Sequence, residues 1–283
     1  MNKILITGGA GNIGSSLANR LVKKPNNYVV IVDNLLTGDT NKLPDRKYEN
    51  WRFIKADVNV FKDISSIMLA NQFDFVFHYA AVVGVKRTLD NPKMVLDDID
   101  GIKNVLDLSK NTSVKRIFFS SSSEVYGEPV EIPQFEDTTP LNSKLPYAIV
   151  KTVGEAFFKS YHQEFGLDYT IFRFFNTYGP RQSTDFVISK FIDLALKGKD
   201  ITIYGAGTQS RTFCYIDDNL DTIEKILMEN HCINDVINIG SDKEYTILEL
   251  ANVIIKQLNS NSKIAFFPPL KDGDMTRRKP DLT

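Results

Sequence analysis

The chain has 283 residues, of which 42% are hydrophobic and 24% charged, values typical of a soluble globular protein. This composition excludes a disordered, collagen-like or coiled-coil chain, and 34 basic against 35 acidic residues argue against a nucleic-acid binder. No run approaches the roughly 20 apolar residues of a membrane helix. A strand-like run begins at Lys3, which leaves no room for a signal peptide. Two cysteines and three scattered histidines offer no metal site. We therefore expect a cytoplasmic, metal-free protein with no membrane or nucleic-acid partner.

Residues 1–175 alternate β-rich apolar runs with longer helical segments, which predicts an α/β fold with a Rossmann-type doubly wound parallel sheet. Runs such as 28–32 lack polar alternation, as expected for strands covered on both faces. The expected strands are Lys3–Thr7, Tyr28–Asp33, Arg52–Lys55, Phe73–His78, Lys115–Ser121 and Asp168–Arg173. The expected helices are Ile13–Lys23, Asp63–Ala70, Lys93–Lys110 and Tyr147–Phe165.

Beyond residue 175 the alternation becomes less regular, and segments rich in glycine, proline and polar residues appear. Helices are expected at Phe186–Leu196, Ile216–Glu229 and Thr246–Leu258, between short strands. We expect residues 176–283 to form a smaller C-terminal α/β lobe that is integrated with the domain formed by residues 1–175.

The first strand leads into a glycine-rich turn, Thr7-Gly8-Gly9-Ala10-Gly11-Asn12-Ile13-Gly14. Its spaced glycines permit a tight turn, close approach of the backbone to a pyrophosphate, and close packing of the following helix on the strand. The helix N-terminus then offers unpaired N–H groups to the phosphate charge. The run predicts a dinucleotide site whose phosphate-binding residues are Gly8, Gly11, Asn12, Ile13 and Gly14.

Asp33 ends the second strand, where its carboxylate can accept hydrogen bonds from the adenosine ribose and would repel a 2′-phosphate. We therefore expect NAD rather than NADP as the cofactor. Asp57 and Val58 follow the third strand and are candidates for flanking the adenine, although a solvated loop aspartate fits that position equally. The expected cofactor-binding residues also include Asn34 and Ala80.

Tyr147 is followed four residues later by Lys151, and it alone among the eleven tyrosines has this spacing. On a helix the two side chains share one face. A buried ammonium beside a phenol favours the phenolate and would lower the pKa of the tyrosine. Such a tyrosine can take a proton from a substrate hydroxyl while a hydride leaves for nicotinamide. The serine run 120–123 ends the fifth strand, at the edge where open α/β sheets bind ligands, and supplies a hydroxyl for the same oxygen.

Four further features accompany one another in chain order. They are the spacing Gly-x-x-Gly-x-x-Gly, the run Ser-Ser-Glu-Val-Tyr-Gly at 122–127, and two longer segments at 173–181 and 203–217. Together with the Tyr-x-x-x-Lys pair they resemble the extended short-chain dehydrogenase/reductases, the NAD-dependent nucleotide-sugar epimerases, dehydratases and decarboxylases. The resemblance covers essentially the whole chain, and it implies a nucleotide-diphosphate sugar as substrate.

The resemblance implies a catalytic triad of Ser122, Tyr147 and Lys151, in which Tyr147 is the base and Lys151 holds both Tyr147 and the nicotinamide ribose. Residues 1–175 would be the NAD-binding domain and 176–283 the nucleotide-sugar-binding lobe. Helices Lys93–Lys110 and Tyr147–Phe165 would pair with their copies in a homodimer with a four-helix interface. In the lobe, the resemblance implies that Asn176 contacts the sugar or its phosphate, that Arg181 shapes the substrate pocket, and that Arg211 and Arg278 grip the diphosphate.

Family members share an opening oxidation of the sugar, usually at C4, and then diverge. Glu124 stands where 4,6-dehydratases and decarboxylases carry a glutamate, and a carboxylate there can act on the C5 proton; a structural role in the loop is the other interpretation. Ser123 departs from the aspartate of one dehydratase group, residues 278–281 resemble the decarboxylases, and residues 80–85 resemble the 4-epimerases. Asp98 departs from the asparagine that is usual in its helix.

We expect C4 oxidation with 4-epimerisation as the net outcome. The alternatives are a nucleotide-sugar 4-dehydrogenase (4-oxidase) that releases the 4-keto sugar, a 4,6-dehydratase and a UDP-glucuronate decarboxylase. An NAD-sensing regulatory protein on the same fold is disfavoured, because such a protein does not need the tyrosine–lysine pair. A small-alcohol or steroid dehydrogenase would have no reason to place arginines at 181, 211 and 278.

Overall fold

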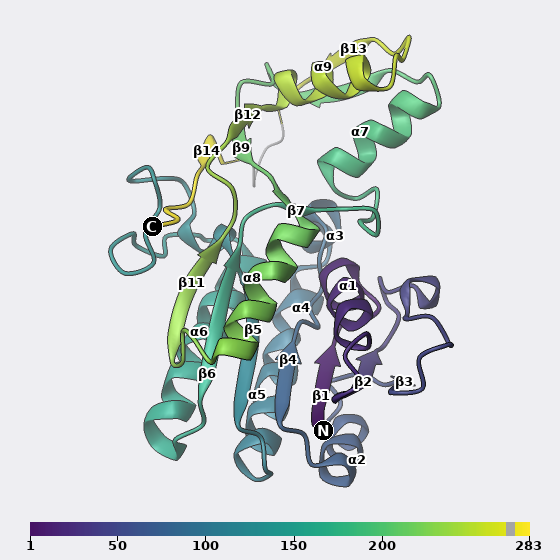
Figure 1. Ribbon diagram of the computed structural model, residues 1–283. Coiled ribbons are helices and arrows are strands. Elements are labelled where there is room, and N and C mark those ends of the chain that lie inside the picture. Colours follow the sequence, from purple (N-terminus) through teal and green to yellow (C-terminus); the bar gives the residue numbers. More distant parts are fainter. Residues whose placement is uncertain (270–274) are drawn as a thin grey trace.

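Seven parallel strands form the central sheet of the computed structural model, which describes residues 1–269 and 275–283 (Figure 1). Thr7 lies beside Val32 and His78, and Ser122 lies beside Phe174, so the strands end close to a common edge. From one side of the sheet to the other the strands are β11 (Asp235–Ile239), β6 (Tyr169–Phe174), β5 (Arg116–Ser122), β4 (Phe75–His78), β1 (Asn2–Thr7), β2 (Asn27–Asp33) and β3 (Trp51–Lys55).

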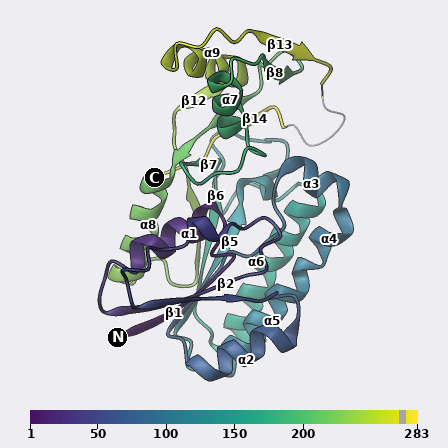
Figure 2. The same cartoon turned by 90° about the vertical axis from the view of Figure 1, so that its right-hand side faces the viewer.

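Helices cover both faces of this sheet (Figure 2). One face packs against α1 (Asn12–Leu21) and α8 (Ile216–Glu229), and the other packs against α2 (Phe61–Asn71), α5 (Asp98–Lys110) and α6 (Pro146–Phe165). Because both faces are covered, the strands read as nearly continuous apolar runs. Helix α6 comes especially close to the sheet, since a Cβ on Gly154 would lie 2.4 Å from the ring of Phe119. The doubly wound Rossmann-type fold predicted from the sequence is confirmed.

A smaller lobe lies over the carboxyl ends of the strands (Figure 1). Its core is a separate apolar cluster that includes Phe191, Ile201, Ile203 and Ala251. Its elements are β7 (Thr177–Tyr178), α7 (Val187–Leu196), β8 (Ile201–Tyr204), β9 (Ser210–Thr212), β10 (Cys214–Tyr215), β12 (Glu244–Thr246), α9 (Ile247–Gln257), β13 (Ile264–Phe267) and β14 (Arg277–Arg278). None of the helices in the described part of the chain is long and apolar enough to cross a membrane.

The chain leaves the large sheet and later returns to it. After β6 it builds part of the lobe, and then α8 and β11 rejoin the large sheet, where β11 pairs with β6. The expected boundary after residue 175 is therefore not a single division of the chain. Residues 216–239 lie beyond it, but they pack with the large sheet and not with the lobe.

Two local differences from the sequence-based expectation lie near the sheet edge. The single helix expected at Lys93–Lys110 is instead two helices, α4 (Pro92–Leu96) and α5, and a further helix, α3 (Val85–Asp90), precedes them. The buried carboxylate of Asp98, at the first residue of α5, accepts the backbone N–H of Val82 at 2.7 Å. This contact ties the start of α5 to the loop after β4, so tertiary structure rather than helical periodicity sets the break.

Candidate active site

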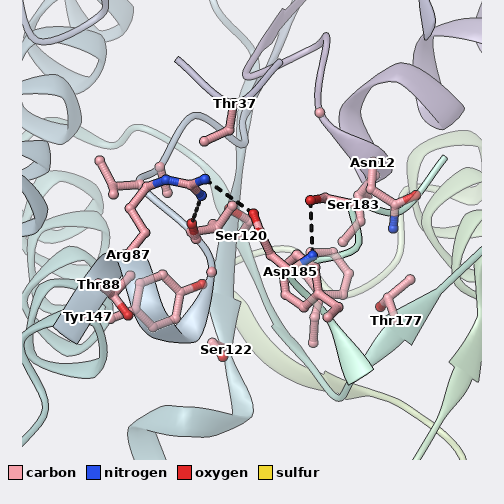
Figure 3. A pocket seen from close by; sticks show the side chains of 18 of the residues that line it. Asn12, Thr37, Arg87, Thr88, Ser120, Ser122, Tyr147, Thr177, Ser183 and Asp185 are labelled. Atoms are coloured by element: carbon pink, nitrogen blue, oxygen red, sulfur yellow. Dashed lines mark hydrogen bonds and ion pairs between the residues drawn. The ribbon is translucent and has the colours of Figure 1, made fainter. Parts of the chain in front are cut away.

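A cavity of about 760 Å³ lies between the carboxyl ends of the strands and the smaller lobe. Figure 3 shows side chains from both parts of the molecule pointing into it. The residues expected to bind a cofactor all line it: Gly8, Gly11, Asn12, Ile13, Gly14, Asp33, Asn34, Asp57, Val58, Ala80, Tyr147 and Lys151. The structure therefore brings together, in one place, residues that are spread over the first 151 positions.

The glycine-rich turn is shaped for a ligand with a diphosphate. A Cβ on Gly14 would lie 2.5 Å from the carbonyl oxygen of Gly8, and Gly8 itself has φ +66°. The turn therefore closes only without side chains at these positions. The turn delivers the chain into α1, whose first N–H groups are available to an anion. The buried Oδ1 of Asn12 has no hydrogen-bond partner among the described residues, as expected where a ligand completes the site.

Asp33 is held rigidly at the end of β2. Its Oδ2 accepts the N–H of Ala10 at 3.0 Å, and its Oδ1 accepts the N–H of Leu35 at 2.8 Å. Next to it, Asn34 donates to the Oδ2 of Asp57 at 3.0 Å. A carboxylate oxygen can accept more than one hydrogen bond, so Asp33 keeps acceptor capacity for the two hydroxyls of a ribose. This free acceptor capacity at Asp33 fits the adenosine ribose of NAD.

Tyr147 and Lys151 lie in the first two turns of α6. Figure 3 shows Tyr147 near Ser122, the last residue of β5. Ser122 lies close enough to Tyr147 for its hydroxyl to lower the pKa of the phenol. Ser122 also accepts the N–H of Glu124 at 3.2 Å and thereby caps the short 3-10 helix η2 (Ser123–Tyr126). The ammonium of Lys151 lies 3.4 Å from the Oγ of Ser120 and 5.6 Å from the centre of the Tyr147 ring. A hydroxyl, a phenol and an ammonium thus converge at one point of the cavity.

The pKa of Tyr147 differs from the sequence-based expectation. The spacing predicts a pKa lowered by Lys151, but burial and the nearby charge of Glu124 raise the pKa of this phenol above its ordinary value. The hydrogen bond with Ser122 and the charge of Arg278 act in the opposite direction without outweighing burial. Burial also lowers the pKa of Lys151 to about 8, although Asp98 opposes this shift. The lysine is therefore a weaker source of positive charge than the spacing alone predicts.

Two arginines lie side by side in the cavity wall. Strands β9 and β14 pair in parallel, with Arg278 opposite Arg211. Both residues are nearly buried, 5% exposed for Arg211 and 8% for Arg278. Arg278 Nη1 lies 3.6 Å from the Oε1 of Glu124 and donates to the Oγ of Ser123 at 3.4 Å, while Arg211 donates to the carbonyl of Ser210 at 2.7 Å. Neighbouring buried guanidinium groups are typical of a phosphate-binding site.

Of the two other residues expected to contact the substrate, one lines the cavity and the other does not. Asn176 lines the cavity and donates to the carbonyl of Thr212 at 2.9 Å, with a backbone φ of +33°. Arg181 does not line the cavity. Its guanidinium instead donates to the carbonyl of Lys42 and so joins the lobe to the loop after β2. The structure thus gives Arg181 a contact between the two parts of the molecule instead of a place in the pocket wall.

The sequence did not indicate Arg87 and Asp185, which form an ion pair at the cavity (Figure 3). Arg87 Nη2 lies 3.2 Å from the Oδ2 of Asp185, and Arg87 Nη1 donates to the carbonyl of Val83 at 2.6 Å. Arg87 comes from α3 and Asp185 from the segment before α7, so the pair links the sheet side of the cavity to the lobe. No local pattern could reveal it, because the partners are far apart in sequence and α3 was not expected.

The fold and the site together define an enzyme of the extended short-chain dehydrogenase type. A family model described as the NAD dependent epimerase/dehydratase family matches residues 4–240. The chain belongs to the NAD-dependent epimerase/dehydratase family, and its cofactor is NAD.

Similar proteins carry out different net reactions. The chain is 38% identical, over 99% of its length and 89% of the relative's, to a UDP-N-acetyl-alpha-D-glucosaminuronate decarboxylase of Bacillus cytotoxicus. It superposes with a TM-score of 0.93 and 31% identity on the UDP-glucose 4-epimerase of Thermotoga maritima with UDP-glucose, covering 99% and 90% of the two chains. It superposes with a TM-score of 0.91 and 34% identity on a UDP-N-acetylglucosamine 4-epimerase of Methanobrevibacter ruminantium in complex with UDP-N-acetylmuramic acid, covering 100% and 90%.

Replacing Asp33 tests the cofactor half of the site. In Asp33→Ser we expect the dissociation constant for NAD to rise about tenfold, because a charge-assisted hydrogen bond to the ribose is lost. We also expect the ratio of the NADP dissociation constant to the NAD dissociation constant to fall. Isothermal titration with both dinucleotides measures the two effects. Asp39→Ser is the matched control, since Asp39 is an exposed aspartate of the following loop. Unchanged NAD affinity with NADP still excluded would contradict the assignment.

Proposed function

We propose that this chain is a nucleotide-sugar 4-epimerase that oxidises the sugar at C4 and then reduces it from the opposite face. The observation that carries the proposal is the convergence of Ser122, Tyr147 and Lys151 in the same cavity as the dinucleotide turn and the two buried arginines. This arrangement supports a substrate that carries both a sugar hydroxyl and a diphosphate. The structural similarity to two 4-epimerases gives it independent support.

In the proposed mechanism Arg211 and Arg278 hold the diphosphate and leave the sugar near the end of β5. Ser122 and Tyr147 share hydrogen bonds with the C4 hydroxyl, and Tyr147 accepts its proton as the C4–H bond breaks. Gly8, Gly14 and Asp33 would hold NAD, which would supply reversible hydride transfer and a positive charge beside the tyrosine. Tyr147 then gives its proton back to the C4 oxygen of the inverted sugar. Protons and electrons balance over the cycle, so no external oxidant is consumed.

A specific observation favours decarboxylation as the second candidate. Glu124 and Arg278 lie 3.6 Å apart at the end of β5, and the decarboxylase relative is 38% identical. In a uronic sugar, oxidation at C4 makes the C6 carboxylate part of a β-keto acid, whose C5–C6 bond breaks with release of carbon dioxide. An acidic side chain such as Glu124 would then supply the proton that C5 requires.

The first experiment is incubation with UDP-glucose, UDP-N-acetylglucosamine and their uronic acids, followed by chromatography and mass spectrometry. We expect a new peak of unchanged mass, the signature of epimerisation. In Tyr147→Phe we expect turnover to fall at least about 100-fold, because the proton acceptor is lost. Tyr161→Phe is the control, since its hydroxyl contacts Asp107 near the far end of α6. Loss of carbon dioxide would replace epimerisation with the second candidate, and turnover by Tyr147→Phe at the wild-type rate would refute both.

Neutralising Glu124 gives a pH signature. The anionic Glu124 raises the pKa of Tyr147, so its removal lowers that pKa and makes the base available at lower pH. In Glu124→Gln we therefore expect the rising limb of the kcat/KM profile to move to lower pH, with the epimerised product still formed. Glu164→Gln, at the exposed end of α6, is the control. A shift toward higher pH, or complete loss of epimerisation, would contradict the role proposed here for Glu124.

We also propose a homodimer. Exposed apolar side chains are found on two helices that pack on one face of the sheet. They are Met94 and Leu96 on α4 and Ile149 on α6, each about two-fifths exposed. A second copy packing α4, α5 and α6 against their equivalents would bury them. Sedimentation equilibrium is expected to give twice the mass of one chain for the wild type and one chain mass for Ile149→Asp. Leu258→Asp, exposed in the lobe, should stay dimeric, and a monomeric wild type would refute the dimer.

We also propose that the protein is located in the cytoplasm. Cys214 and Cys232 are both free thiols, and Cys214 is buried with a pKa raised to about 11 by that burial. Free thiols are usual in a reducing compartment, which supports this location.

A further inference from the structure

Arg173 and Glu155 form a buried ion pair behind the catalytic residues. Each side chain is 3% exposed, and the two meet through a pair of parallel hydrogen bonds, Nε to Oε1 at 3.0 Å and Nη2 to Oε2 at 2.7 Å. Arg173 belongs to β6 and Glu155 to α6. Removing two charges from water costs about as much as their attraction returns, so such a pair is weak evidence for a purely stabilising role.

The glutamate end of the pair holds the strand that carries Ser122. Glu155 Oε1 accepts the hydroxyl of Ser121 at 2.5 Å, and Ser121 directly precedes Ser122 on β5. Glu155 lies about one helical turn beyond Lys151 and two beyond Tyr147 on the same helix. This carboxylate therefore fixes the end of β5, which carries Ser122, relative to α6, which carries Tyr147.

The arginine end of the pair holds the turn that carries Glu124. Arg173 Nη1 donates to the Oη of Tyr126 at 2.9 Å and to the carbonyl of Glu136 at 3.0 Å. Tyr126 is buried and ends η2, the turn that contains Glu124. Its hydroxyl donates in turn to the Oδ1 of Asn238 on β11 at 2.8 Å.

The same network reaches the segment that carries Arg278. Asn238 Nδ2 donates to the carbonyl of Gln134 at 2.9 Å. The backbone of Gln134 lies alongside the C-terminal segment, which Figure 1 shows next to the loop that precedes α6. There the N–H of Gln134 donates to the carbonyl of Lys279 at 2.8 Å, one residue beyond Arg278. One continuous set of hydrogen bonds thus connects β5, α6, η2 and the C-terminal segment that carries Arg278.

We infer that Glu155, Arg173 and Tyr126 are positioning residues, which set the distance between Ser122 and Tyr147 and hold the turn of Glu124. The kinetic test of this inference rests on the proposed function. The structural test, which measures the distance between Ser122 and Tyr147, does not. The groups that act on Tyr147 from the surrounding elements are Glu124 of η2, Asp98 of α5, Arg278 of β14 and Lys151 of α6. All four residues are retained in the variants that test the inference.

Two single-hydroxyl deletions test the inference with little risk to folding. Ser121→Ala removes the bond to Glu155, and Tyr126→Phe removes the bonds to Arg173 and Asn238. We expect kcat to fall about tenfold in each, since a 1 Å misplacement can cost about 100-fold, with KM changed less than about twofold. In Ser121→Ala we expect the pH profile of kcat to move to higher pH, because displacement of Ser122 weakens an interaction that lowers the pKa of Tyr147.

Arg116 provides a matched control for stability. It is also a buried arginine, 3% exposed, on β5, but it lies at the opposite end of that strand. Its guanidinium donates to the carbonyls of His231 and Cys232 and to Thr170. Arg116→Lys should lower Tm without moving kcat or its pH profile. If the two deletions lower kcat only in proportion to Tm, and leave the pH profile where the wild type has it, the network is structural and the inference fails.

Crystal structures of the NAD-free wild type and both deletions provide a readout independent of turnover. We expect the distance between Ser122 Oγ and Tyr147 Oη to lengthen in the deletions, and an unchanged distance would overturn the inference. If the wild type turns over no nucleotide sugar, the proposed function fails, and the measured distance still decides whether these residues position the pair.

Discussion

The site depends on one constraint, the parallel direction of all seven strands in the large sheet. Because the strands run the same way, their carboxyl ends meet at one edge, and whatever follows each strand enters the same cavity. The strands are buried on both faces, so their order and register cannot slip without exposing apolar side chains. In this way each of five strands places a group at the cavity: Gly8 after β1, Asp33 in β2, Ala80 after β4, Ser122 in β5 and Asn176 after β6.

Opposing influences act on the pKa of Tyr147. Burial raises the pKa of Tyr147 and lowers that of Lys151 to about 8, so without other charges the pair favours a neutral phenol and a weakly charged amine. The protein opposes this with the Ser122 hydrogen bond and the charge of Arg278. Reactivity therefore depends on the separation of a few groups on different elements, and this is where the buried pair of Arg173 and Glu155 has its effect.

Local patterns in the sequence predicted most of the large sheet and the residues of the dinucleotide turn. Continuous apolar runs identify covered strands, and the i, i+4 spacing of Tyr147 and Lys151 requires only a helix. The remaining features depend on contacts between distant segments. The return of β11 to β6, the ion pair of Arg87 with Asp185 and the contact of Arg181 with Lys42 each join segments far apart in sequence. The roles expected for Arg211 and Arg278 rest on family resemblance. Their adjacency depends on the pairing of β9 with β14, which no local pattern predicts.

The return of β11 to the sheet has a consequence for how the protein folds. A nascent chain that ends just after β6 lacks β11, so the edge of β6 is unpaired. It also lacks α8, so the part of the sheet face that α8 covers is exposed to water. An open, apolar strand edge is a template for pairing with other chains. The two parts of the molecule therefore cannot mature one after the other. The large sheet is complete only once about 240 residues have been synthesised. We therefore expect a chain cut after residue 175 to lack a stable fold.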